Sequence, residues 1–196
     1  MKSFIIGKPK YKTAIVYSFI SIAFSIAMIV AKAWQGIDIA GYFIIIVTLL
    51  IVLPGLSYSP IVWKVTDNTL LFTGYPHFFH KTIAFYKRLF GVTKTIYQNS
   101  LKLNEIDFIN ITWEDVPMFP YGLIGHPIIF NIHTKDGSII QMNSLIITDS
   151  KKYSAAVAYM KKQGIIFIDK HHILEAIADP TIQVSKYIDD IERGRK

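Results

Sequence analysis

Two long runs without a charged residue dominate the first third of the chain, Thr13–Ala31 and Ile39–Trp63. A helix rises about 1.5 Å per residue, so roughly 20 apolar residues cross the hydrocarbon core of a bilayer while pairing their own backbone groups. We therefore predict transmembrane helices over residues 13–33 and 39–57. Residues 34–38 then form a short external loop, and the two helices form a tight hairpin.

The charges that flank the two runs predict the orientation of this hairpin. Residues 1–12 carry four lysines and no acidic residue, whereas residues 32–38 carry one lysine and one aspartate. Because positive residues concentrate on the cytoplasmic side, we predict a multi-pass protein of the cell membrane with both termini cytoplasmic. The competing interpretation is a cleaved signal peptide ending near Ala31-Lys32-Ala33. The length of the first run, and the second run directly behind it, count against that alternative.

The pattern changes after residue 60 to an alternation of apolar and polar residues, which is typical of half-buried β-strands. Thr66-Asp67-Asn68 is a turn between two such runs, and Asp136-Gly137 is a strong hairpin signal between two others. The predicted strands cover residues 62–65, 69–73, 95–103, 108–113, 128–133, 138–145 and 165–168.

Helical periodicity returns near the C-terminus. Asp149 or Ser150 can cap a helix that Gly164 ends, and its apolar face consists of Tyr153, Ala156, Val157 and Met160. Further helices are predicted over residues 171–178 and 181–193, divided by Asp179-Pro180. The chain is therefore predicted to combine a membrane helical hairpin with an α+β domain, and residues 165–196 form a C-terminal strand and helical extension.

Four segments carry a family resemblance: Val62–Thr73, Leu101–Ile106, the hairpin His126–Leu145 and the helix Ser150–Gln163. Behind two membrane helices, this order resembles bacterial membrane proteins with a pleckstrin-homology-like domain. The resemblance implies that residues 60–164 form such a domain in the cytoplasm. Its fold would be an antiparallel, strongly bent sheet or partial barrel with a capping C-terminal helix. That family has no invariant functional signature, and residues 74–94 and 116–122 depart from its pattern.

Small residues recur every four positions in the first apolar run, at Ala23, Ala27 and Ala31, with Ser21 and Ser25 on an adjoining stripe. Small residues at this spacing permit close approach of another helix, so we predict that the alanines pack against the second span. The alternative is that alanine and serine are simply common in membrane helices.

A basic and aromatic segment follows the second span. Between Asn68 and Asn104 the chain has five Lys and Arg residues and no acid, interleaved with Phe and Tyr. Such a mixture suits the headgroups of an anionic membrane. The alternative is that its aromatics belong to a core and its lysines to an ordinary surface. The residues predicted to contact the membrane surface are Lys81, Phe85, Lys87, Arg88, Phe90 and Lys94.

The amino-acid composition excludes several kinds of site chemistry. The chain is 52% hydrophobic and has no cysteine, which excludes disulfides, thiol catalysis and a lipoprotein anchor. It has six histidines without a zinc-binding motif, so we interpret them as structural or surface residues and predict no metal site. Glu114-Asp115 and Asp189-Asp190 are adjacent acids whose side chains diverge on a regular element. We predict no catalytic residue, no cofactor and no enzyme.

The leading functional hypothesis is a non-enzymatic, membrane-anchored binding or scaffold protein whose cytoplasmic domain recruits a protein partner or contacts anionic lipid. The alternative is an accessory or immunity-type membrane protein that acts through its transmembrane hairpin. Nucleic acid is not an expected partner, because the chain beyond residue 57 is only modestly basic. Self-association into a homo-oligomer is left open, and a channel is disfavoured because neither span carries an ionisable residue.

Overall fold

The computed structural model describes residues 3–31, 34–57, 62–74, 78–93, 95–118, 123–144 and 150–194. The chain divides into two compact units. Unit 1 comprises Met1–Gly7, Ile61–Gly74 and Tyr97–Lys196, and unit 2 comprises Lys8–Pro60 and Tyr75–Ile96.

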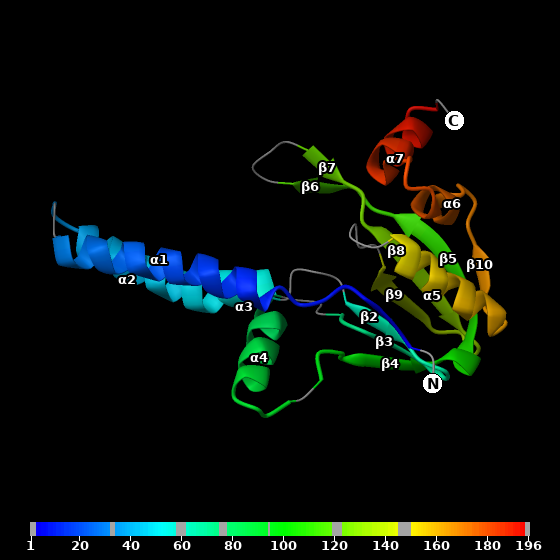
Figure 1. Ribbon diagram of the computed structural model, residues 1–196, viewed down its shortest axis with the longest axis horizontal. Helices are drawn as coiled ribbons and strands as arrows, with labels where there is room; N and C mark the ends of the chain where they lie inside the picture. Colours follow the sequence, from blue (N-terminus) through cyan, green and yellow to red (C-terminus); the bar gives the residue numbers. More distant parts are fainter. Residues whose placement is uncertain are drawn as a thin grey trace. The chain divides into compact units, whose positions relative to one another are not determined.

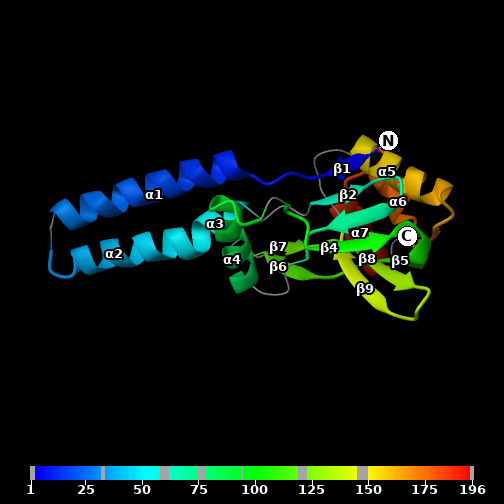
Figure 2. The same cartoon turned by 90° about the horizontal axis from the view of Figure 1, so that it is seen from below.

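Unit 2 is built on a pair of long helices that run side by side in Figures 1 and 2. The first is α1 (Tyr11–Ala31), and the second, Ile37–Ser57, is likewise 21 residues long. Both are long and apolar enough to span a membrane, as the sequence predicts. The second helix has three parts, α2 (Ile37–Val47), a π-helical turn η1 (Thr48–Val52) and α3 (Leu53–Ser57).

The same unit contains a helix for which no element was predicted, α4 (Phe78–Leu89), within the residues 74–94 that depart from the family pattern. Lys87 and Arg88 in its last turn stabilise the helix because cations interact favourably with the C-terminal end of the helix dipole. Gly91, with a φ of 73°, ends it: the Gly91 and Val92 N–H groups donate to the carbonyls of Arg88 and Lys87.

Unit 1 contains two four-stranded sheets and a short hairpin (Figure 1). The first sheet has the order β1-β2-β3-β4 and is antiparallel throughout; the second has the order β10-β5-β8-β9. The first consists of β1 (Phe4–Ile6), β2 (Trp63–Val65), β3 (Thr69–Phe72) and β4 (Asn99–Lys102). The second consists of β5 (Ile106–Trp113), β8 (Ile128–Thr134), β9 (Ile139–Asn143) and β10 (Ile166–Ile168). The hairpin is β6 (Val116–Met118) with β7 (Leu123–Gly125), and a 3-10 turn, η2 (Leu103–Glu105), precedes β5.

These sheets confirm an α+β fold and correct the expected architecture. Among the described residues the strands form two separate four-stranded sheets and a two-stranded hairpin, and no barrel is present. Within residues 60–164 the described strands pair antiparallel, as predicted, and β10, which lies in the predicted C-terminal extension, pairs with β5 in parallel. Parallel strands need a crossover connection, usually helical, and α5 (Ser150–Lys162) lies in the chain between β9 and β10.

Two local predictions had different outcomes. The Asp136-Gly137 turn joins β8 to β9 as predicted, with Gly137 at a φ of 87°, where a side chain would be strained. The strand β1 was missed, because three residues are too few for a period-two pattern to be read. It pairs antiparallel with β2, with Ile5 opposite Lys64.

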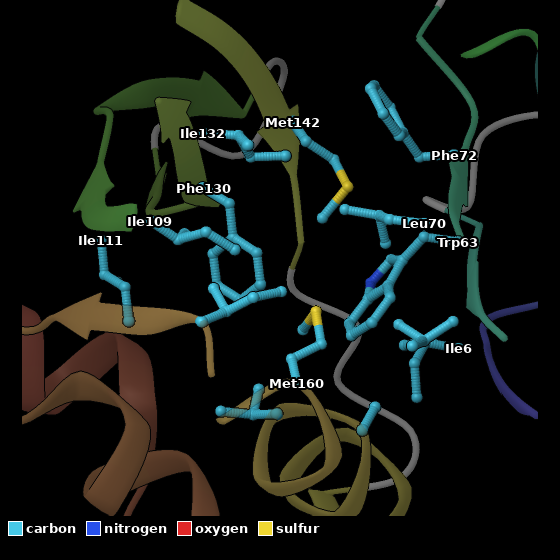
Figure 3. Packing of buried hydrophobic residues seen from close by; sticks show 14 of the residues in the cluster. Ile6, Trp63, Leu70, Phe72, Ile109, Ile111, Phe130, Ile132, Met142 and Met160 are labelled. Atoms are coloured by element: carbon cyan, nitrogen blue, oxygen red, sulfur yellow. The ribbon is translucent and has the colours of Figure 1, made fainter. Parts of the chain in front are cut away.

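The core of unit 1 lies between the two sheets and α5 (Figure 3). Trp63 of β2 stands edge-on to Tyr153 of α5, with ring centroids 5.7 Å apart, and Phe130 of β8 lies 6.2 Å from Trp63. The Trp63 indole Nε1–H donates to the Ser144 carbonyl at 2.9 Å. Offset or edge-on aromatic contacts of this kind stabilise a core beyond the area they bury. Two further helices, α6 (Ile173–Ala178) and α7 (Val184–Glu192), add Ile173, Ile177 and Ile188 to this core.

Candidate functional site

The second long helix of unit 2 changes its hydrogen-bond register near its C-terminal end. In an α-helix the carbonyl of Leu50 would accept from residue 54, but that residue is Pro54, which has no N–H. The N–H of Leu53 is directed to the carbonyl of Thr48, five residues back, instead of to Leu49. The π-helical turn and the proline thus withdraw the usual α-helical donors from the Leu49 and Leu50 carbonyls.

Helix α4 supplies replacement donors to both carbonyls. The Thr82 hydroxyl donates to the Leu50 carbonyl at 3.0 Å, and the Tyr86 hydroxyl donates to the Leu49 carbonyl at 2.8 Å. Burial raises the pKa of Tyr86 above its ordinary value, so its hydroxyl keeps the proton that it donates. Residues four apart lie on the same helix face, so one face of α4 makes both bonds.

The anchored face of α4 is buried, and a different part of its surface carries charge and exposed apolar side chains. Thr82 is 9% exposed and Phe85 is 6% exposed. Arg88 places its guanidinium 5.7 Å from the ring centroid of Tyr11 in α1, a cation–π distance. The exposed apolar side chains on and just beyond the helix are Phe79, Ile83, Leu89, Phe90 and Val92.

The residues predicted to contact a membrane surface fall into three groups. Lys87 and Phe90 are exposed, and Lys81 and Arg88 are half-buried. Phe85 lies inside the unit, edge-on to Tyr86 with ring centroids 5.1 Å apart, so it is not part of the exposed surface. Lys94 lies outside the described residues.

Sequence reasoning missed the two hydroxyls that hold α4. A signal was available: Pro54 inside an apolar run predicts an unpaired carbonyl four residues earlier, and Thr82 and Tyr86 have helical spacing. Nothing local connects these two observations, since the paired residues lie 32 and 37 positions apart.

The contact between α1 and the second helix uses a serine-containing stripe. Ala14, Ser18 and Ser25 are buried, and a Cβ on Gly41 would lie 2.8 Å from the Ser25 carbonyl oxygen, so the backbones approach closely there. A hydroxyl–hydroxyl hydrogen bond of 2.8 Å joins Ser21 and Thr48. The residues predicted for helix packing, Ala23, Ala27 and Ala31, are exposed on α1. Their packing role stays a prediction.

Comparison with known proteins yields no relative: no family model, no curated protein and no solved structure matches this chain. The α4 surface and its anchoring bonds therefore have to be interpreted from their own chemistry.

Proposed function

We propose that this chain is a non-enzymatic membrane protein that crosses the bilayer twice and binds anionic lipid headgroups with α4. The observation that carries this proposal is α4 itself, a cationic and apolar surface anchored by two hydroxyl–carbonyl bonds to the end of an apolar helix. Unit 1 then serves as a binding or scaffold domain that recruits a partner protein at the membrane.

Two features support the membrane location. Both long helices expose large apolar side chains over most of their surface, for example Phe19 at 73%, Val30 at 76% and Ile39 at 71%. A surface of this kind needs an apolar solvent. A carbonyl left without a partner in that solvent costs several kcal/mol, which explains why the Leu49 and Leu50 carbonyls are given donors.

The strand pairing supports an even number of membrane crossings. β1 precedes α1 in the chain and β2 follows α3, yet the two strands are hydrogen-bonded neighbours in one sheet. Both ends of the hairpin must then leave a membrane on the same side. The lysines in residues 1–12 favour the cytoplasm as that side, with both termini there.

The surface of α4 suits the boundary between headgroups and acyl chains. Lys81, Lys87 and Arg88 supply positive charge, and Phe79 and Phe90 supply apolar area. Each cation near an anionic leaflet contributes about 1 kcal/mol, and aromatic rings favour the interface. The pleckstrin-homology-like resemblance of residues 60–164 stays a prediction beside this proposal.

Fluorescence quenching in reconstituted vesicles tests the proposal on the full chain. Because the protein has no cysteine, Val92→Cys, at a residue 70% exposed, carries a single fluorophore beside α4. Quenchers attached to lipid headgroups should reduce its emission more in phosphatidylserine-containing vesicles than in phosphatidylcholine vesicles. Salt should diminish this difference, since screening acts over roughly 8 to 10 Å near physiological ionic strength.

A charge-matched pair of variants separates α4 from general electrostatics. Replacing Lys81, Lys87 and Arg88 together by Gln should abolish the preference for anionic lipid. Replacing three exposed lysines of unit 1 by Gln should leave it intact; these are Lys151, Lys162 and Lys170. Equal quenching in both lipids, or equal effects of the two triple variants, would contradict a headgroup role for α4.

A further inference from the structure

A second group of interacting side chains lies in unit 1, around the buried His126. Its imidazole is only 2% exposed, with Nδ1 3.0 Å from Asp115 Oδ1 and Nε2 3.0 Å from Asp189 Oδ1. Asp115 immediately precedes β6 and His126 immediately follows β7, so the two residues face each other at the base of this hairpin. Asp189 comes from α7, 63 residues further along the chain.

A neutral imidazole cannot satisfy both carboxylates. It has one N–H, so one ring nitrogen donates while the lone pair of the other faces a carboxylate oxygen. The ring nitrogen without a proton can therefore accept either a proton or a metal ion in front of this carboxylate.

Glu192 distinguishes these two occupants. One ligand atom from each of Asp115, His126 and Glu192 lies within 4.8 Å of the others. The indole Nε1–H of Trp113 donates to Glu192 Oε1 at 2.7 Å and so orients this carboxylate. A second ring proton on His126 would account for both aspartates, but it gives no role to an oriented third carboxylate.

We propose that Asp115, His126 Nδ1 and Glu192 bind a divalent transition-metal ion of the zinc class. One imidazole and two carboxylates form a donor set that Zn²⁺ accepts, and the two carboxylates balance its charge. Asp189 and Trp113 act as positioning residues. Asp189 accepts the Nε2–H of His126 and thereby directs the Nδ1 lone pair at the metal, as carboxylate–histidine–metal arrangements do.

The metal has a structural consequence and a chemical one. It links Glu192 of α7 to Asp115 and His126 at the base of the β6–β7 hairpin, two parts of unit 1 that are distant in sequence. Three protein ligands are one fewer than a structural zinc site uses, so a fourth coordination position is available to water or to a ligand from a partner. The side chain of Asp115 is 51% exposed, which leaves the site accessible.

Metal titration of the full chain in detergent, after treatment with a chelator, tests this site. Calorimetry should detect one Zn²⁺ per chain, and Co²⁺ should give the visible absorption of a protein-bound ion. Glu192→Gln keeps an oxygen that can accept from Trp113 but loses the charged ligand, and Asp115→Asn does the same at the hairpin. Each should weaken binding by more than roughly tenfold, beyond the lower end of losses seen for residues outside the ligand set.

Matched variants exclude other sources of binding. Asp190→Asn removes the same charge from the same helix outside the group and should bind Zn²⁺ as the unaltered chain does. Asp189→Asn, which retains an acceptor for His126 Nε2–H, should weaken binding less than Glu192→Gln. Circular dichroism of each apo variant verifies that it is folded. Absence of Zn²⁺ binding at micromolar concentration, or equal affinity in Glu192→Gln, Asp115→Asn and the unaltered chain, would overturn the site.

Discussion

The two hydroxyl–carbonyl bonds that hold α4 predict an unusual dependence between distant substitutions. Thr82→Val is nearly isosteric and removes only the donor to the Leu50 carbonyl. Leaving the partly buried Leu50 carbonyl without its partner costs about 1–3 kcal/mol. In the docked state α4 lies against the second long helix, and in the undocked state it has separated from it. If about 1–2 kcal/mol of this cost appears in that docking equilibrium, the undocked population rises roughly 5- to 30-fold.

Pro54→Ala should cancel most of this effect. The new N–H at position 54 can donate to the Leu50 carbonyl in the normal α-helical register, so Thr82 loses its distinctive role. In the Pro54→Ala background we expect Thr82→Val to change the free energy of α4 docking by less than about 0.5 kcal/mol. This is the usual limit for a substitution that leaves no polar group without a partner. The two substitutions are therefore expected to be strongly non-additive.

Cysteine labelling measures the docking equilibrium directly. Phe85 is 6% exposed, so Phe85→Cys in an otherwise cysteine-free chain should react with a maleimide only when α4 undocks. Thr82→Val should raise the labelling rate of this site in proteoliposomes 5- to 30-fold, and much less when Pro54→Ala is present. Val92→Cys, which is exposed throughout, serves as the control whose rate should not change. An equal acceleration in the two backgrounds would refute the reasoning.

Three further predictions concern the packing of each unit. Gly41→Ala should destabilise the helical hairpin by about 1–3 kcal/mol in detergent unfolding, because its Cβ would lie 2.8 Å from the Ser25 backbone oxygen; unchanged stability would show that the helices can separate there at no cost. Burial raises the pKa of Tyr153 above its ordinary value of about 10, so the hydroxyl ionises more readily in the unfolded chain. Its contribution to stability is present below pH 10 and is lost above it, by about 1.4 kcal/mol between pH 9 and pH 11; Tyr153→Phe should remove this part of the pH dependence in urea titrations. Trp63→Phe leaves the Ser144 carbonyl without its indole donor and should lower the free energy of unfolding by about 1–3 kcal/mol, and a neutral result would deny that bond a role.

The sequence by itself determined the elements whose signals are local. Two uncharged runs of membrane-spanning length define the helical pair, and Asp136-Gly137 defines the β8–β9 hairpin. The i, i+3, i+4 spacing of Tyr153, Ala156 and Val157 defines the buried face of α5. Each of these patterns is contained within about 20 residues, where backbone geometry and hydrophobic period act directly.

The tertiary structure alone decided which distant groups meet. Thr82 finds the Leu50 carbonyl across 32 residues, and His126 finds Asp189 across 63. The same holds for β1, whose three residues become a strand only because β2 offers them a free edge. The physical reason is that these polar groups carry no periodic signal of their own. Their partners are chosen by burial, since a carbonyl freed by Pro54 or an imidazole enclosed in the fold has to be paired by whatever the packed chain brings near it.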